Sequence, residues 1–189
     1  TQINARFNVN LENIKEDVTF GNVKSGNTVV IAKNLGKDFT FGNLDADTIA
    51  TNSTDNVRFV FDKVKGDVTF GNITNLSSLD GDFRNIDKSL TIGSITNSKG
   101  NSAIALNLDN IKKDVNLGSM QSTKLDITAK GLGKDFTVGN LDVMATATST
   151  VTHNANISFD GVAGNIQLAN VEKFNNVKFD AKNVEGTFT

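Results

Sequence analysis

Residues 37 to 44 read K-D-F-T-F-G-N-L, and closely related words recur along the chain. Residues 66 to 73 read G-D-V-T-F-G-N-I, and residues 134 to 141 read K-D-F-T-V-G-N-L. Aligning the chain on this stretch gives a longer template, Φ-x-Φ-x-Φ-x-x-Φ-x-x-D-Φ-T-Φ-G-N-Φ, in which Φ is an apolar residue. Eight copies can be traced, the last of them ending at Thr189. The chain is therefore a repeat protein, and its architecture follows from what a single copy can bury.

The early apolar positions of each copy alternate with other residues, which is the period of a β-strand and not of a helix. In the first copy these positions are Phe7, Val9 and Leu11, followed by Ile14. Twelve of the 13 Phe residues fall on apolar template positions, and only Phe174 lies in a connector. One copy alone would expose its apolar edge, so the copies must stack to bury it.

The template stays constant while the segment between copies changes in length. Successive residues at the glycine position are separated by 21, 29, 22, 25, 21 and 30 residues. They are Gly21, Gly42, Gly71, Gly93, Gly118, Gly139 and Ala169. Constant rungs with variable connectors are typical of a solenoid with its loops on one side. We predict an all-β, right-handed parallel β-solenoid (β-helix) of about eight rungs, the hand following the general preference of parallel crossovers.

The composition agrees with this prediction. The 189 residues include no Pro, Cys, Trp or Tyr, and proline is excluded from inner strands because it cannot donate to a β-ladder. The net charge of −2 argues against a nucleic-acid binder, and no apolar run reaches the ~18 residues of a membrane span. We expect residues 1–189 to form a single β-solenoid domain. Because no cap is recognisable at either end, we also expect a segment of a longer protein or a module that polymerises.

Two polar template positions are expected to form ladders along the rod, because equivalent residues of stacked rungs lie over one another. The Thr ladder comprises Thr19, Thr40, Thr69, Thr91, Asn116, Thr137 and Gln167. The Asn ladder, beside the corner glycine, comprises Asn22, Asn43, Asn72, Ser94, Ser119, Asn140 and Asn170. Stacked hydroxyls and amides can hydrogen bond between rungs. We interpret both ladders as stacking devices.

A third ladder carries negative charge. The Asp ladder comprises Asp17, Asp38, Asp67, Asp114 and Asp135, with Ser89 and Asn165 at the same position in two other rungs. Two unit charges ~4.8 Å apart repel by about 0.9 kcal/mol in water, so this repulsion must be offset. Lys37, Lys113 and Lys134 directly precede three of the Asp residues. Backbone N–H groups at the corners could also stabilise the carboxylates.

A divalent cation between rungs is the alternative interpretation, since Ca²⁺ takes carboxylate and carbonyl oxygens as ligands. The five Asp residues of the ladder are then the candidate metal ligands, and Ca²⁺ is the candidate cofactor. The glycine-rich Ca²⁺ repeat G-G-x-G-x-D-x-Φ-x does not occur in the chain, which favours the stacking interpretation.

The only histidine is His153, and identical carboxylates do not supply the two different environments that acid–base catalysis needs. We therefore assign no catalytic residue and expect no enzyme.

One local departure from the template concerns outward positions of the second and third rungs. Val29 and Ile31 fall on outward positions, and Val60 lies beside Ile31 in the next rung. Adjacent outward apolar side chains should be covered or should bind something. The connector 45–56, with its stretch 48–51, could fold back over them as an extra strand. A register shift of one residue in the second rung is the alternative.

The Cys-free, Pro-free chain with D-Φ-T-Φ-G-N repeats resembles the β-solenoid regions of large bacterial surface proteins. S-layer proteins exported by one-step secretion are the most similar, followed by autotransporter passengers and filamentous haemagglutinin-type adhesins. The resemblance implies a secreted structural protein at the bacterial cell surface, with Ca²⁺ as the cofactor expected of S-layer proteins. Its expected partners are other copies of itself, flanking domains of the same chain, or a cell-surface glycan.

Two functions are therefore expected, and both are non-enzymatic. The first is a component of a surface layer or coat that self-assembles or spaces other domains. The alternative is an adhesin stalk or passenger that binds host or matrix ligands. A polysaccharide-degrading β-helix needs a cluster of charged residues in one groove, and an ice-binding solenoid needs two Thr ranks in T-x-T spacing. The template supplies Asp where the second Thr rank would be.

Overall fold

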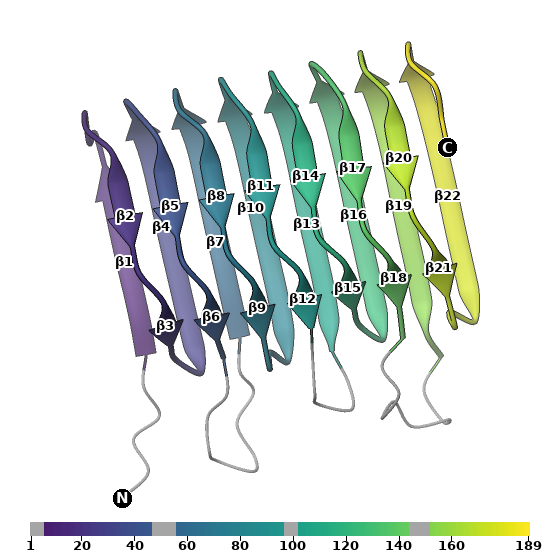
Figure 1. Cartoon of the computed structure of the whole chain (residues 1–189), viewed down its shortest axis with the longest axis horizontal. Coiled ribbons are helices and arrows are strands. Elements are labelled where there is room, and N and C mark those ends of the chain that lie inside the picture. The colour runs from purple at the N-terminus through teal and green to yellow at the C-terminus, as the bar shows by residue number, and fades with distance from the viewer. Residues whose placement is uncertain (1–5, 47–55, 97–101, 144–151) are drawn as a thin grey trace, which may run out of the picture.

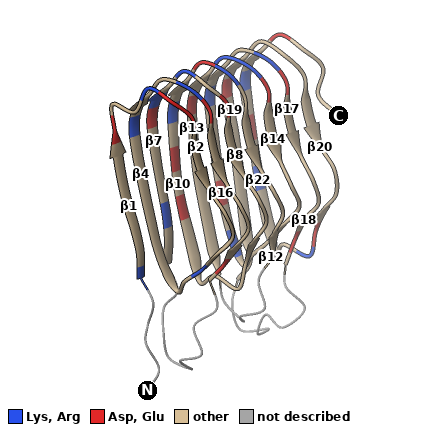
Figure 2. Ribbon diagram, turned by 60° about the vertical axis from the view of Figure 1, so that its left-hand side comes forward, with Lys and Arg blue, Asp and Glu red and all other residues tan. Residues whose placement is uncertain are grey.

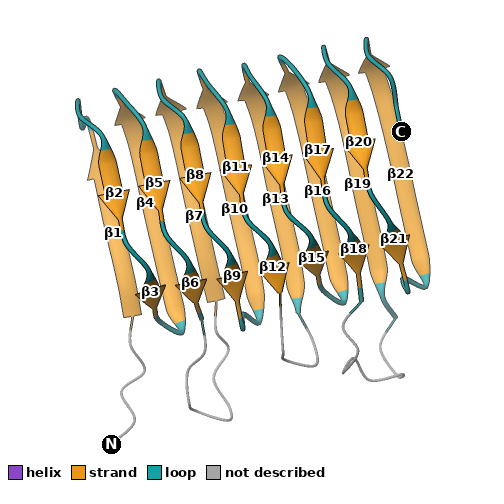
Figure 3. Ribbon diagram, in the orientation of Figure 1, coloured by secondary structure: helices purple, strands orange, loops and turns teal. Residues whose placement is uncertain are grey.

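The computed structural model describes residues 6–46, 56–96, 102–143 and 152–189. Within these ranges every regular element is a β-strand, and the strands form three sheets that are parallel throughout (Figures 1 and 3). Each of the first seven template copies forms a long strand, a turn, a three-residue strand, a corner and a two-residue strand, and the eighth forms the long strand and one isolated bridge between Phe188 and Ile166. The predicted β-solenoid of eight rungs is confirmed.

Sheet A contains the long strand of each rung and has eight strands in chain order. They are β1 (Arg6–Glu12), β4 (Asn27–Leu35), β7 (Asn56–Val64), β10 (Ser78–Ile86), β13 (Ala103–Ile111), β16 (Lys124–Leu132), β19 (Asn154–Val162) and β22 (Asn176–Val184). β-Branched and aromatic residues alternate with polar ones along these strands, so one face of the sheet is apolar and the other is polar.

Sheets B and C contain the two short strands of the first seven rungs, seven strands in each sheet. Sheet B consists of β2 (Val18–Phe20), β5 (Phe39–Phe41), β8 (Val68–Phe70), β11 (Leu90–Ile92), β14 (Val115–Leu117), β17 (Phe136–Val138) and β20 (Ile166–Leu168). Sheet C consists of β3 (Val23–Lys24), β6 (Leu44–Asp45), β9 (Ile73–Thr74), β12 (Ile95–Thr96), β15 (Met120–Gln121), β18 (Leu141–Asp142) and β21 (Val171–Glu172).

The rungs coil in a right-handed sense, with sheet A on one side and sheets B and C on the other (Figure 1). The turns from sheet A into sheet B lie along one edge of the rod. The segments that lead from sheet C to the next long strand lie along the opposite edge (Figure 3). Changes in connector length therefore occur at one edge only, as the spacing of the repeat predicts.

The core lies between the layers and is continuous from rung to rung. Apolar template positions of the inner rungs are at most a few per cent exposed, among them Val30, Phe59 and Leu108. The Phe residues of the first four rungs form one connected column, in which the rings of Phe59 and Phe70 stack with centroids 4.4 Å apart. Aromatic contacts of this kind stabilise by about 0.5–1.5 kcal/mol beyond the area that they bury.

The second rung keeps the template register. Val29 pairs with Arg58 and Ile31 pairs with Val60, while Val30 and Ala32 point into the core. The register-shift interpretation is therefore wrong, and the outward apolar side chains are real and half-buried. Residues 48–51, proposed to cover them, lie outside the described residues.

The turn that ends each long strand has a backbone conformation that the sequence analysis did not predict. One residue there has positive φ in all eight rungs: Asn13, Asn34, Lys63, Asn85, Asn110, Gly131, Gly161 and Asn183, with φ between 53° and 74°. Asn and Gly tolerate this left-handed region better than other residues. Their recurrence immediately before the fourth apolar template position is the signal that could have revealed the turn.

The corner glycines between sheets B and C are required by the close approach of neighbouring rungs. A Cβ atom on Gly93 would lie 2.6 Å from Asn72 Oδ1 and 2.7 Å from the carbonyl carbon of Gly71. Gly21, in the first rung, has no atom within 4 Å of the equivalent position. Glycine therefore avoids a close contact where the corner of one rung rests on the corner of the rung before it, as it does from Gly42 to Gly139.

This contrast predicts different effects for the same substitution at two corners. Gly93→Ala should lower the free energy of unfolding by about 1–3 kcal/mol, because backbone atoms must move apart to admit the methyl group. Gly21→Ala, the matched control, should leave stability unchanged or raise it by up to about 1 kcal/mol through the unfolded state. Urea unfolding followed by circular dichroism measures both. Equal effects at the two corners would show that rung contact does not select the glycine.

Candidate functional site

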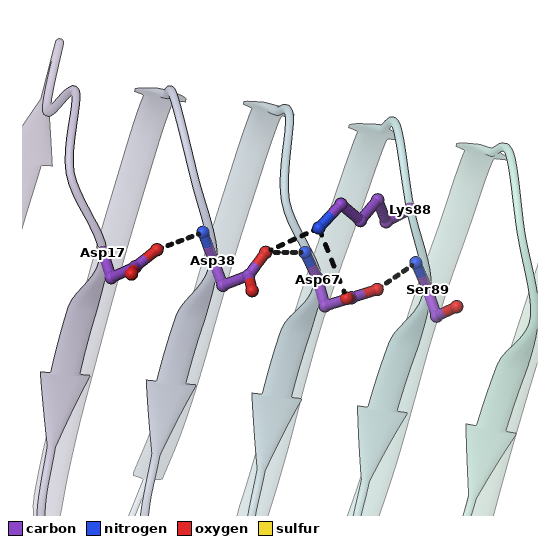
Figure 4. A network of polar contacts seen from close by, with 5 residues as sticks. All are labelled: Asp17, Asp38, Asp67, Lys88 and Ser89. Atoms are coloured by element: carbon purple, nitrogen blue, oxygen red, sulfur yellow. Dashed lines mark hydrogen bonds and ion pairs between the residues drawn. The ribbon is translucent and has the colours of Figure 1, made fainter.

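The Asp ladder forms at the start of sheet B, as predicted, and its carboxylates bind the backbone of the following rung. Asp17 Oδ1 accepts the N–H of Asp38 at 3.1 Å, and Asp38 Oδ1 accepts that of Asp67 at 2.9 Å. Asp67 Oδ1 accepts the N–H of Ser89 at 2.9 Å (Figure 4). Asn165 receives the same bond from Thr187. The carboxylates therefore act as acceptors that link rungs.

These bonds offset part of the repulsion between stacked carboxylates. The backbone N–H of Asp67, followed by the ammonium group of Lys88, lowers the pKa of Asp38. Lys88 Nζ lies 3.1 Å from Asp38 Oδ1 and 3.7 Å from Asp67 Oδ2, between two members of the ladder (Figure 4). Hydrogen bonding and charge interaction with Asp38, joined by Asp67, raise the pKa of Lys88.

The lysine that bridges the ladder was missed by the sequence analysis. Lys37 pairs with Glu16 and not with the aspartate that follows it. For Lys113 and Lys134 no ion pair is recorded within the described part of the chain. The bridge comes from Lys88, which reaches back to the carboxylates of the two preceding rungs, while its own rung has Ser89 in place of Asp. In the sequence, this bridge is indicated by Lys88 directly preceding Ser89, the one Ser of the Asp ladder.

The five candidate metal ligands of the Asp ladder lie in two groups of adjacent rungs, Asp17, Asp38 and Asp67 in one and Asp114 and Asp135 in the other. Within the residues that the structure describes, no group of three or more His, Cys, Asp or Glu side chains could hold a metal ion. One oxygen of each carboxylate in the first group already binds a backbone N–H of the next rung. Ca²⁺ binding stays a prediction.

The Asn ladder repeats the same device at the corner between sheets B and C. Asn22 Oδ1 accepts the N–H of Asn43 at 2.9 Å, and Asn43 Oδ1 accepts that of Asn72 at 2.8 Å. The Thr ladder is also in register, with Thr19, Thr40 and Thr69 in consecutive rungs. Because the Asp and Asn ladders connect one rung to the next, their first role is structural.

A fourth file of side chains, which we call the charge rank, runs along the outer face of sheet A near the end of each long strand. Its members alternate in sign without exception in the register of the sheet: Glu12, Lys33, Asp62, Arg84, Asp109, Lys130, Asp160 and Lys182. The alternation appears in Figure 2 as red and blue segments near the ends of the long strands. Opposite charges at directly paired positions stabilise a sheet, whereas like charges destabilise it.

The environment of Arg84 illustrates the electrostatics of the charge rank. Its guanidinium lies 2.6 Å from Asp82 Oδ2 on the same strand, and this contact is the main cause of its raised pKa. Asp109 and Asp62, its neighbours in the charge rank, add to the effect. The sequence analysis missed the rank, because alternating signs at one template position look like an unconstrained position.

His153 lies directly before β19 and is 9% exposed. Its backbone carbonyl accepts N–H groups of Asn175 and Asn176, and its N–H donates to Asn175 Oδ1 at 2.8 Å. The ring atom Nδ1 is buried without a hydrogen-bond partner in the described part of the chain. The contacts that the structure gives this residue therefore connect one rung to the next through the backbone.

Comparison with known proteins yields no relative: no family model, no curated protein and no solved structure matches the chain. In the described ranges, no helix is long and apolar enough to cross a membrane. The fold and its ladders are therefore the basis for any functional conclusion.

The bridge formed by Lys88 predicts a pH-dependent contribution to stability. The lowered pKa of Asp38 means that its stabilisation is present above the unfolded value, 3.8, and is lost as the pH falls through the folded value. Lys88→Gln should therefore destabilise the protein at neutral pH, and its difference from wild type should shrink below pH 3.8. Urea unfolding across the acid range measures this difference. Lys113→Gln, at the same template position of the next rung, is the control and should have less effect.

The charge rank predicts an effect that depends on ionic strength. Asp109→Lys would place three cations in consecutive rungs, so it should destabilise the protein more than Asp109→Asn at low salt. Added salt should reduce this difference, because exposed charges are screened. Thermal unfolding in low and high NaCl compares the two variants. If they melt together at low salt, the alternation does not contribute to stability.

Proposed function

We propose that the chain is a rod-shaped structural segment of a bacterial surface layer or coat, which self-associates or spaces other domains at the cell surface. The observation that carries the proposal is the direction of the polar contacts. The Asp, Thr and Asn ladders and the charge rank all run along the rod, so these repeated polar positions serve the stacking of rungs.

The packing of the apolar core between neighbouring rungs also supports a mechanical role for the rod. Sheet A continues through all eight rungs, and each rung packs on its neighbours across the full width of the rod. In a solenoid of this kind the length is proportional to the number of rungs, and stiffness comes from contacts between neighbours. Such a rod is suited to holding other parts of a coat at a fixed distance.

The location at the cell surface and the partners are part of the same proposal. They rest on the resemblance of the repeat to bacterial surface solenoids. The partners would be further copies of the chain or flanking domains. The alternative, an adhesin stalk, shares the rod and differs in staying monomeric while a ligand binds to it.

Self-association and the metal prediction can be tested together. We expect the purified chain to form ordered sheets or filaments, seen by light scattering and negative-stain microscopy, in millimolar Ca²⁺ and after addition of a chelator. If assembly requires Ca²⁺, the double variant Asp114→Asn/Asp135→Asn tests whether the Asp ladder holds the metal. Assembly of this variant without Ca²⁺ would assign the metal to the ladder. Asn is a suitable substitute because Asn165 already occupies this position in the seventh rung. A monomer under all conditions would contradict the lattice function for this segment.

A further inference from the structure

A groove of about 450 Å³ lies along the edge of the rod where sheet A turns into sheet B, over the first four rungs. Lys15 of the first rung and Lys65 of the third occupy the same template position, two rungs or ~9.6 Å apart. Gly36 occupies this position in the rung between them and carries no side chain there. The half-buried side chain of Ile14 contributes apolar surface to the groove, whereas Leu35 is only 1% exposed.

The charges around the groove are strongly unbalanced. Lys15, Lys63 and Lys65 are exposed, and no ion pair is recorded for any of them within the described residues. The one acidic residue of the lining, Asp87, is already paired with Lys112, whose Nζ lies 2.6 Å from Asp87 Oδ1. Amide side chains from the left-handed turn, such as Asn34 and Asn85, add neutral hydrogen-bonding groups.

The chain contains a natural test of whether these lysines are needed for folding. Residues 32–45 and 129–142 are identical at 12 of 14 positions, and the similarity continues around them, so rungs 1–4 correspond to rungs 5–8. In the second set Gly161 corresponds to Lys63, and Ala163 corresponds to Lys65. Both sets form the same rungs with the same turn. The fold therefore does not require lysine at these positions.

We propose that the groove binds an acidic glycan, a sugar chain that carries carboxylate or sulfate groups. Lys15 and Lys65, which lie two rungs apart at the same template position, suit a ligand whose anionic groups recur along its length. The half-buried apolar side chain of Ile14 suits the carbon–hydrogen face of a sugar, and the amides of Asn34 and Asn85 suit its hydroxyls. The structure favours a glycan over a nucleic acid, because no aromatic side chain lines the groove to stack a base.

This inference goes beyond the proposed structural role and does not depend on self-association. Binding is measured by calorimetry with the full chain, and the probes are oligogalacturonate for carboxylate and dextran sulfate for sulfate. Neutral dextran and a single-stranded DNA oligonucleotide are the comparison ligands. We expect wild type to bind at least one acidic glycan, with an affinity that falls as NaCl is added. The glycan that binds more tightly identifies the anionic group.

The decisive variant is Lys63→Gly/Lys65→Ala, which introduces the residues that the chain itself uses in its seventh rung. Affinity for the acidic glycan should fall about tenfold or more while the circular dichroism spectrum and melting temperature stay the same. Lys113→Gln/Lys134→Gln, on the same edge but outside the groove lining, is the matched control and should bind like wild type.

The reverse exchange tests whether these positions are sufficient. Gly161→Lys/Ala163→Lys should create a second groove and raise the number of bound oligosaccharides from one to two per chain. Unchanged affinity in Lys63→Gly/Lys65→Ala would overturn the proposal, as would equal binding of neutral dextran. Tighter binding of the oligonucleotide than of either glycan would overturn the ligand class. Failure of the chain to assemble would affect only the structural proposal.

Discussion

The structure depends on one constraint: parallel pairing places each residue directly over its equivalent in the neighbouring rung, about 4.8 Å away. Every template position therefore becomes a file of side chains that must be compatible with one another. Apolar files meet this requirement by packing, as the rings of Phe59 and Phe70 do. Amide and carboxylate files meet it by binding backbone N–H groups of the next rung. The charge rank meets it by alternating in sign.

The backbone is subject to the same constraint. Where two corners touch, there is no room for a Cβ atom, and glycine occupies the corner in the first six rungs. The seventh rung has Ala169 instead, and its N–H lies 3.2 Å from the carbonyl oxygen of Val138. The equivalent bonds from Gly42 and Gly118 are 3.0 Å and 2.8 Å. The longer bond is the expected response to an added methyl group between the rungs.

The repeat predicted the fold, the register and three ladders, because these features recur at fixed template positions. It could not predict features that depend on differences between copies. Lys88 bridges Asp38 and Asp67 from a rung that itself has Ser89 at the ladder position, so the bridge is not part of the shared template. Lys15 and Lys65 line one groove with Gly36 between them, an arrangement that is visible only when rungs are placed side by side. The template keeps only the residues that the copies share, whereas the structure shows which of the differing residues lie next to one another.

Strict alternation in the charge rank gives the rod a parity. Gain or loss of one rung inside the rod would bring two like charges together, whereas gain or loss of two adjacent rungs would preserve the pairing of opposite charges. The internal correspondence between rungs 1–4 and rungs 5–8 obeys this rule, since Glu12, Lys33, Asp62 and Arg84 match Asp109, Lys130, Asp160 and Lys182 in sign. At the junction of the two sets, Arg84 therefore faces Asp109. A rod of this type is expected to lengthen by even numbers of rungs, with a unit of four as the step preserved in this chain.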